Sequence, residues 1–235
     1  MSFLFWKKKK IAKQEIVFCP VCKQRFSAEG FVFLTGECGI CHACEAKLPY
    51  TPRDGSFEGT EHLDYVLSPF YYQDPVKALL LQYKFQHQWA YGELLADITA
   101  QLLKPYPQLA NFDLVLPVPL SKQRLKERGY NQSAVFARKL ASILEQPIYS
   151  EALSRPVHTK RQSGLNARLR QLNVQDAFLA EPKEVEGRSV LLVDDIFTTG
   201  STMRSCAKEL RSKGCARVVG VPVTIVEPPK ERLLL

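Results

Sequence analysis

The sequence predicts an α/β fold built on a parallel sheet and preceded by a small cysteine-rich unit. Short apolar strands alternate with helical segments through the second half of the chain. One strand, "RSVLLVDD", has a nearly continuous apolar body, as expected when both faces of a strand are covered. The cysteines near the N-terminus indicate the separate unit. With 235 residues, the chain has room for one sizeable domain and a small appendage.

The composition, with 46% hydrophobic and 24% charged residues, is typical of a globular protein, and no apolar run is long enough to predict a transmembrane helix. The formal net charge of +8 favours polyanionic partners, including phosphorylated small molecules. The start, "MSFLFWKKKK", places its lysines after its apolar residues, which is the reverse of a secretory signal, so we expect a cytoplasmic protein. We interpret residues 1–14 as a basic tail, either disordered or in weak contact with nucleic acid or an acidic partner.

The cysteine-rich segment, residues 15–55, has the spacing of a zinc ribbon. In a reducing compartment, clustered cysteines are typical of metal sites rather than disulfides. Zinc takes four ligands at tetrahedral corners, and each C-x-x-C pair supplies two thiolates on one side of such a site. Because four thiolates leave no open position, we expect a structural zinc rather than a catalytic one. The expected ligands are Cys19, Cys22, Cys41 and Cys44.

The register of this zinc site stays open on sequence grounds. Cys38 forms a second C-x-x-C pair with Cys41, and its distance from Cys22 is also acceptable. His42 is a further possible ligand. A zinc ribbon of this kind can contact nucleic acid or protein, and the spacing alone does not distinguish the two.

Residues 56–110 are predicted to form a linker and an accessory subdomain that packs against the main sheet. "PRDGSFEGT", residues 52–60, has the composition of a linker or turn, and the following "HLDYVLSPFYY" is strand-like. Residues 74–104 are predicted to be helical in one or two pieces, with Asp74 as the cap and Pro75 in the first turn. Lys84 in this helix either faces a phosphate or is solvated on the helix surface.

Residues 111–228 are predicted to form the main α/β core, followed by a tail at 229–235. The helix at 121–144 is expected to be interrupted at Gly129. Alternating strands and helices imply right-handed βαβ units, whose ligands gather at the carboxyl ends of the strands. The expected strands lie within residues 112–119, 146–155, 188–195 and 216–226, and the expected helices within 121–144 and 200–214.

"VDDIFTTGST" places two carboxylates, Asp194 and Asp195, at the end of one such strand and then a loop of small residues. Gly200 lets the backbone turn tightly, and the amides of a tight loop and helix start can cradle a phosphate. No lysine follows the glycine, so this is not the P-loop pattern. The carboxylates would repel a phosphate but suit sugar hydroxyls or a magnesium ion, so the pattern indicates a phosphorylated sugar as ligand.

These residues resemble the ribose-5-phosphate loop of the type I phosphoribosyltransferases, which bind phosphoribosyl pyrophosphate with Mg²⁺. The wider chain resembles the ComF family, which is implicated in bacterial natural competence. The similarity covers most of the chain, and it implies a type I phosphoribosyltransferase fold with an N-terminal zinc ribbon. The matching pieces are "CPVC", "CHAC…LP", "YKF", "PVPL…RGYNQ", "TKRQSGLNARLRQLNVQDAF" and the aspartate loop.

The resemblance implies roles for particular residues. Asp194 and Asp195 would bind the ribose hydroxyls and belong to the catalytic centre. The turn at Pro117–Leu120 would form the pyrophosphate loop, with Val118, Pro119 and Leu120 as its binding residues, although such a turn can also be purely structural. The residues implied for the 5′-phosphate are Thr198, Thr199, Gly200, Ser201 and Thr202.

Residues 157–170 fall where the superfamily has a flexible loop that closes over the reaction. Their basic residues would neutralise a leaving pyrophosphate or remain solvated: Lys160, Arg161 and Arg168, with Arg124 and Arg128 as weaker candidates. Thr198 stands where purine-salvage members often carry an acid that contacts the base. Because a threonine is no proton acceptor of that kind, the resemblance implies sugar-phosphate binding more strongly than transfer to a purine.

The ComF resemblance therefore implies a competence protein for DNA uptake and natural transformation, with Mg²⁺ and phosphoribosyl pyrophosphate or a related ribose phosphate as its ligands. One alternative is an active phosphoribosyltransferase that uses a nitrogen acceptor. Another is a scaffold without turnover that binds single-stranded DNA or a competence helicase. Since the aspartate pair would repel a phosphate chain, DNA contacts are expected on the ribbon, the tail or the basic loop.

Overall fold

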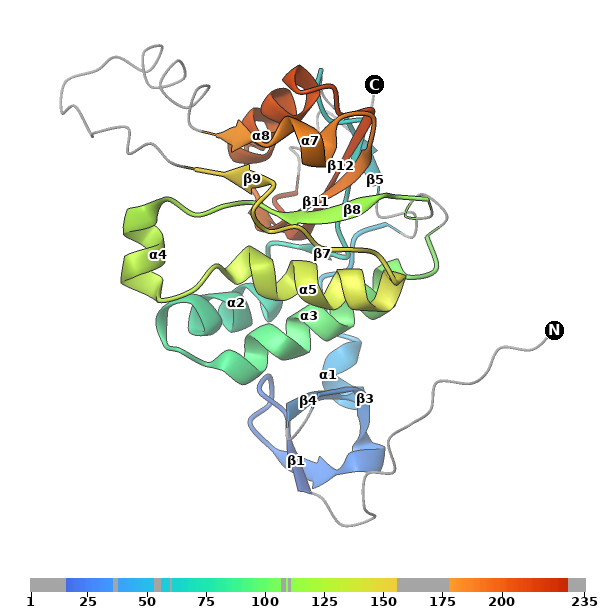
Figure 1. Ribbon diagram of the computed structural model, residues 1–235. Helices are drawn as coiled ribbons and strands as arrows, with labels where there is room; N and C mark the ends of the chain where they lie inside the picture. The colour runs from blue at the N-terminus through green and yellow to red at the C-terminus, as the bar shows by residue number, and fades with distance from the viewer. Residues whose placement is uncertain are drawn as a thin grey trace.

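The computed structural model describes residues 16–35, 38–52, 56–59, 61–106, 109, 111–155 and 178–227. Its centre is a six-stranded sheet in the order β5-β6-β12-β11-β8, with β7 beside β12 (Figure 1). β6, β12, β11 and β8 run parallel, and only β5 is antiparallel to its neighbour. The strands are β5 (Ser56–Glu58), β6 (Tyr65–Leu67), β7 (Phe70–Tyr71), β8 (Leu114–Pro117), β11 (Ser189–Phe197) and β12 (Arg217–Ile225).

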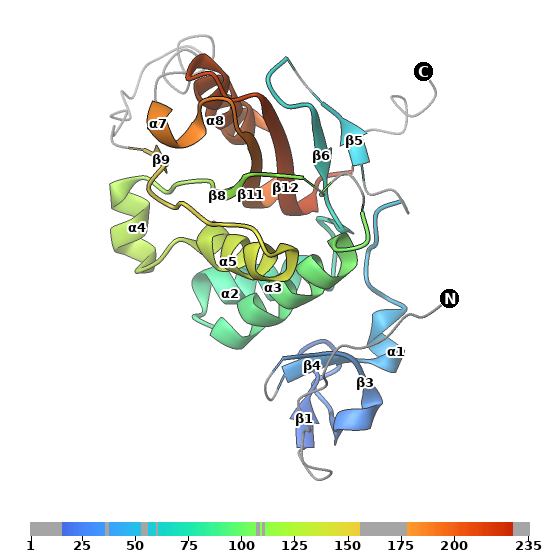
Figure 2. The same cartoon turned by 45° about the vertical axis from the view of Figure 1, so that its right-hand side comes forward.

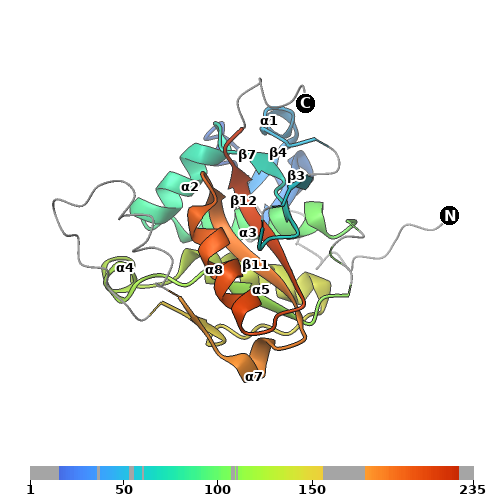
Figure 3. The same ribbon diagram turned by 90° about the horizontal axis from the view of Figure 1, so that it is seen from above.

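Helices cover both faces of this sheet, which confirms the predicted α/β class. In Figure 1 the helices α2 (Val76–Phe85), α3 (Trp89–Leu103) and α5 (Gln132–Leu144) lie below the sheet. Figure 3 shows α8 (Ser201–Ser212) crossing the opposite face, with α7 (Pro182–Val185) at its border.

Side chains of β11 alternate between the two layers. Leu191 and Val193 belong to the core on the α3 and α5 side, whereas Val190 and Leu192 belong to the core under α8. This double burial explains the continuous apolar run of the strand. β11 extends through Phe197, two residues beyond the predicted end, so Asp194 and Asp195 lie within the strand near its carboxyl end.

The break predicted in the helical segment after β8 is confirmed. α4 (Lys122–Arg128) ends at Gly129, whose φ of 78° is the left-handed conformation that closes a helix. Asn131 then caps α5, because its side chain accepts a hydrogen bond from the amide of Ser133. The turn between the two helices is therefore built by a glycine and an asparagine.

Three local predictions in the middle of the chain need correction. α2 begins at Val76 with Pro75 as its capping residue and no side-chain cap, so Asp74 does not cap the helix. Part of the expected linker forms β5, since the edge of the sheet supplies hydrogen-bond partners that composition does not reveal. The single strand expected after it is divided into β6 and β7 around Ser68–Pro69, where proline cannot donate to the ladder.

Segment 56–110 is integrated into the main body. It contributes β5, β6 and β7 to the central sheet, and α2 and α3 to the layer that covers one face. Two further strands, β9 (Leu153–Ser154) and β10 (Leu179–Ala180), pair antiparallel on either side of residues 156–177. No helix in the described ranges is long and apolar enough to cross a membrane.

The N-terminal unit is a four-stranded sheet in the order β2-β1-β4-β3. Figure 2 shows it below the helical layer, and its buried side chains form one continuous core with those of α3. It therefore packs on the main body through apolar contacts. Its elements are β1 (Ile16–Phe18), β2 (Arg25–Ser27), the 3₁₀ turn η1 (Ala28–Gly30), β3 (Phe31–Thr35), β4 (Cys38–Cys41) and α1 (His42–Glu45).

Candidate functional site

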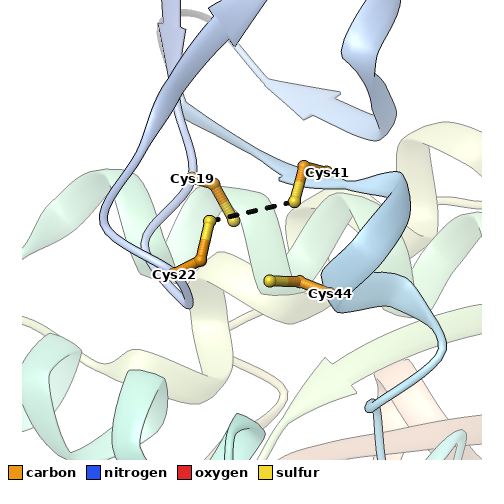
Figure 4. A group of neighbouring side chains, drawn as sticks. All are labelled: Cys19, Cys22, Cys41 and Cys44. Atoms are coloured by element: carbon orange, nitrogen blue, oxygen red, sulfur yellow. Dashed lines mark hydrogen bonds between the residues drawn. The ribbon is translucent and has the colours of Figure 1, made fainter.

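Four cysteines converge at one end of the N-terminal sheet. β1 and β4 are parallel neighbours, so Cys19, just after β1, and Cys41, the last residue of β4, lie toward the same end of the sheet. Figure 4 shows the side chains of Cys22 and Cys44 turned toward the same point. The four sulfur atoms lie within 4.8 Å of one another, and those of Cys22 and Cys41 are 3.9 Å apart. Four thiolates at zinc-bonding distance from one ion lie about 3.8 Å apart, so this arrangement fits a tetrahedral metal site such as that of zinc.

The two alternative ligands lie outside this cluster. Cys38 is buried at the start of β4, and burial raises the pKa of its thiol to about 11, as for a core residue. His42 is exposed at the first position of α1 and is not part of the cluster. The structure thus brings together the set that the sequence analysis expected: Cys19, Cys22, Cys41 and Cys44.

The second site lies at the carboxyl edge of the central sheet, where Asp194 and Asp195 come from β11. Ser133 at the start of α5 donates to Oδ1 of Asp194 over 2.8 Å, and the amide of Asp195 donates to the same oxygen over 2.9 Å. Burial raises the pKa of Asp194 to about 7, and the nearby charge of Asp195 adds to this shift. At neutral pH this carboxyl group is therefore close to the midpoint of its titration.

Lys84 compensates the charge of the second aspartate. Its Nζ lies 2.7 Å from Oδ2 of Asp195, and the two side chains are only 9% and 14% exposed. The sequence analysis weighed Lys84 as a phosphate contact or a solvated lysine, and in the structure it is the ion-pair partner of Asp195. Its functional position and that of Ser133 follow from the packing of α2 and α5 below the sheet, which no local motif encodes.

The loop after β11 is shaped by Gly200. Its φ of 73° is left-handed, and a Cβ atom there would collide with the ring of Phe197. The guanidinium of Arg204 donates to the carbonyl of Thr199, which fastens the loop to the first turn of α8. Thr198, Thr199 and the start of α8 are accessible to solvent, and the hydroxyl of Thr199 donates to that of Ser201 over 3.3 Å. The first amides of a helix have no partner within the helix, so those of α8 are available to a ligand.

A small pocket that is open to solvent, with room for water-sized groups of about 20 Å³, lies between this loop and Asp194. Acceptors on β11 and donors at the helix start thus border the same space. The lining residues are Asp194, Ile196, Phe197, Thr198, Gly200, Ser201, Thr202 and Met203.

The turn after β8 lies directly beside β11. The amide of Val118 donates to the carbonyl of Val193 over 2.8 Å, and the carbonyl of Val118 accepts from the side chain of Asn131. Pro119 has no amide hydrogen, so in this segment the backbone donor that a ligand can use is that of Leu120. The turn is close to the aspartates, but its Val118 backbone is already engaged in holding it there.

Only some of the basic residues expected to contact the pyrophosphate belong to the described part of the chain. Lys160, Arg161 and Arg168 lie outside the described residues. Arg124 on α4 lies close enough to Arg155, after β9, to lower the pKa of that guanidinium together with the larger effect of burial. Two cations therefore lie near each other beside the segment 156–177. Arg155 had no motif to mark it in the sequence.

Two kinds of comparison relate this chain to known proteins. The phosphoribosyl transferase domain model matches residues 131–233, which include β11, the loop and α8. Glutamine phosphoribosylpyrophosphate (PRPP) amidotransferase from B. subtilis, solved with ADP and GMP, is similar over 55% of this chain and 25% of its own, at 21% identity and a TM-score of 0.39.

Curated relatives match over much longer stretches. Competence protein F of Haemophilus influenzae is 32% identical, over 77% of this chain and 87% of that protein. DNA utilization protein YhgH of Salmonella typhimurium is 30% identical over 85% and 86% of the two chains, and competence protein ComFC of Bacillus subtilis is 28% identical over 86% and 92%. This chain therefore belongs to the ComF family, that of competence protein F and DNA utilization protein YhgH, and carries a phosphoribosyltransferase domain.

Proposed function

We propose that the phosphoribosyltransferase domain of this protein binds phosphoribosyl pyrophosphate, or a related ribose phosphate, with Mg²⁺. We further propose that the protein takes part in DNA uptake and use. The observation that carries the proposal is the pocket that Asp194 shares with Thr198, Gly200, Ser201 and Thr202 of the following loop, with Asp195 next to Asp194 on the same strand. Carboxylate oxygens accept hydrogen bonds from vicinal ribose hydroxyls, and helix-start amides donate to a phosphate. The names of the relatives, competence and DNA utilization, support the cellular role.

Within this proposal, each part of the site has one task. Asp194 and Asp195 accept from the ribose hydroxyls, and residues 198–202 hold the 5′-phosphate. Leu120, in the turn with Val118 and Pro119, donates toward the pyrophosphate, and Lys160 and Arg161 close over it. Bound Mg²⁺ would neutralise part of the negative charge of the pyrophosphate, and the carboxylates are the protein groups that could help to hold the ion. The four thiolates hold a structural Zn²⁺ that stabilises the N-terminal unit.

Calorimetric titration of Mg²⁺ with phosphoribosyl pyrophosphate into the zinc-loaded full chain tests the proposal. We expect binding by the wild type and a loss of roughly 100-fold in affinity for Asp194→Asn/Asp195→Asn, because charged hydrogen bonds contribute about 1.5–3 kcal/mol each. The matched control is Glu181→Gln/Glu186→Gln, which removes two exposed carboxylates from the same domain. No binding by folded wild type, or equal binding by the aspartate variant, would contradict the proposal.

A further inference from the structure

Apolar side chains gather on one exposed surface beside, but separate from, the ribose-phosphate pocket. Of the large hydrophobic residues exposed in the described ranges, Leu81, Phe85, Trp89 and Leu125 come from the end of α2, the start of α3 and α4. Phe85 is 64% exposed and Trp89 is 50% exposed. Figures 1 and 2 show α4 on the same side of the molecule as α2. Such a concentration on a small surface marks an interaction site.

The aromatic rings of this surface are held in place by one another. The ring of Trp89 lies with its centroid 4.0 Å from that of Tyr130, and Tyr130 in turn donates its hydroxyl to the carbonyl of Tyr83. The guanidinium of Arg128 lies over the ring of Phe85, 5.6 Å from its centroid. The rings are therefore fixed before any partner arrives, which lowers the entropic cost of binding.

The helix that carries Arg128 is rich in basic side chains. α4 has the sequence KQRLKER and contains no buried residue, so its four basic side chains and its single acid, Glu127, project from the surface. Glu127 already accepts a hydrogen bond from Gln123. Because none of its side chains is buried, α4 contributes little to the hydrophobic core. Its positive charge, next to exposed rings, is complementary to a polyanion that also offers flat apolar faces.

We propose that this aromatic platform, made of Phe85, Trp89 and Tyr130 with Arg128 and the other cations of α4, binds single-stranded nucleic acid. Bases stack on the exposed rings while the phosphates between them lie along α4, and stacking of this kind is tolerant of sequence because every base has a π-face. The platform is neither the ribbon, the tail nor the basic loop at which the sequence analysis expected DNA. It does not depend on ribose-phosphate binding, since Asp194 and Asp195 are not part of it.

The test measures the fluorescence anisotropy of a labelled 20-nucleotide oligo(dT) with the full, zinc-loaded chain. We expect Phe85→Ala/Trp89→Ala to weaken binding about tenfold or more. Tyr149→Ala is the matched control, because Tyr149 is likewise exposed, at 41%, and lies under the guanidinium of Arg188 on a different surface. Undiminished binding by the platform variant, or an equal loss in the control, would overturn the proposal. Asp194→Asn/Asp195→Asn is expected to keep oligo(dT) binding. The proposal for this surface and the proposal for the ribose-phosphate site can therefore be refuted independently.

Two further readouts distinguish stacking from charge and from other occupants. The chain has two tryptophans, so Trp6→Phe leaves Trp89 as the sole reporter, and we expect its fluorescence to be quenched by oligo(dT) but not by an abasic strand of equal length. This readout does not require the platform variant to fold. Absence of quenching, or equal affinity for the abasic strand, would refute base stacking. Sedimentation that shows a wild-type dimer dispersed by Phe85→Ala would assign the surface to a second copy of the chain and overturn the proposal.

Discussion

The cysteine cluster and the aspartate pair both gather acidic groups, but they compensate the resulting charge in different ways. The four sulfur atoms of the cluster lie within 4.8 Å of one another, and those of Cys22 and Cys41 are 3.9 Å apart. The aspartates have partners from the chain itself, because Lys84 pairs with Asp195 and Ser133 donates to Asp194. The first arrangement needs a cation from outside, whereas the second is complete without one.

This difference has a physical consequence for the role of each site. Four thiolates brought together without a metal would repel one another, so we expect the N-terminal unit to depend on a bound cation for folding. We expect the aspartate site to stay folded while empty, because a ligand would add contacts to an arrangement that already exists. We therefore expect the cysteine cluster to take its compensating charge from a bound cation, whereas Asp195 takes it from Lys84.

The largest expected effect is on the cysteine cluster. Cys19→Ser should abolish metal binding and unfold the N-terminal unit, since structural zinc contributes roughly 10–16 kcal/mol to small zinc domains. Elemental analysis of reductant-purified protein is expected to find about one zinc per chain in the wild type and none in the variant. Cys38→Ser is the control and should keep its zinc, because Cys38 is buried outside the cluster. Loss of zinc in the control would mean that Cys38 is a zinc ligand and that the assigned set of four cysteines is wrong.

The next largest effect is expected when the ion pair of Lys84 and Asp195 is broken. Lys84→Met leaves Asp195 as a largely buried carboxylate without its partner, and removal of one member of such a pair costs about 3–5 kcal/mol. Chemical denaturation measures this loss, and Lys84→Met/Asp195→Asn should recover most of it. The exposed pair of Arg188 and Glu184 is the control, where Glu184→Gln should cost less than about 1 kcal/mol. Equal losses at the two pairs would mean that Lys84 does not compensate a buried charge.

A smaller effect is expected in the loop. Gly200→Ala introduces both a left-handed φ for a residue with a side chain and a collision with Phe197, and it should cost about 2–3 kcal/mol together with ribose-phosphate affinity. Gly187→Ala separates the two causes, because Gly187 has a φ of 69° but open space around it. This control should cost about 1 kcal/mol and leave ligand affinity unchanged. The comparison is made by urea denaturation and calorimetry on both variants.

The smallest effect, taken per pH unit, is a dependence of stability on pH. The pKa of Asp194 is raised to about 7, above the ~3.9 of an unfolded aspartate, so the folded chain keeps a proton that the unfolded chain releases between these values. The free energy of unfolding should therefore fall as pH rises from about 4 to 7, by about 1 kcal/mol per pH unit, and this slope should be absent in Asp194→Asn. Denaturation at four pH values checks it.

Ligand affinity should change with pH in the opposite direction. The deprotonated carboxylate is the form that accepts from ribose hydroxyls, so affinity of the wild type for the ribose phosphate should increase from pH 6 to pH 8. The comparison with Asp194→Asn separates this titration from that of the ligand phosphates. An identical pH profile in the variant would contradict the role of Asp194.

The sequence was most informative where one local motif determines both structure and chemistry. The apolar run of β11, the glycine break after α4 and the spacing of the cysteines predicted the α/β class, the α4–α5 turn and the four converging thiols. Each of these follows from burial, a left-handed glycine or ligand spacing within a short segment. The roles of Thr198 and its neighbours, and of the turn at Val118–Leu120, stay predictions.

Features that depend on contacts between distant segments were missed. Lys84 and Asp195 are separated by most of the domain in sequence, and only the packing of α2 below the sheet brings them within 2.7 Å. Composition predicts a linker or turn where β5 forms, because an edge strand needs only one neighbour and carries little apolar periodicity. The platform formed by Phe85, Trp89 and Arg128 likewise arises where α2, α3 and α4 meet.

The most direct test of the account is a crystal structure of the zinc-loaded chain with phosphoribosyl pyrophosphate and Mn²⁺ in place of Mg²⁺, with anomalous maps at both metal edges. The account predicts zinc among Cys19, Cys22, Cys41 and Cys44, the ribose hydroxyls at Asp194 and Asp195, and the 5′-phosphate in the loop at 198–202. The manganese should lie with the pyrophosphate. A ligand bound elsewhere, or manganese that occupies the cysteine cluster, would contradict the division of the molecule into a structural metal centre and a preformed ligand site.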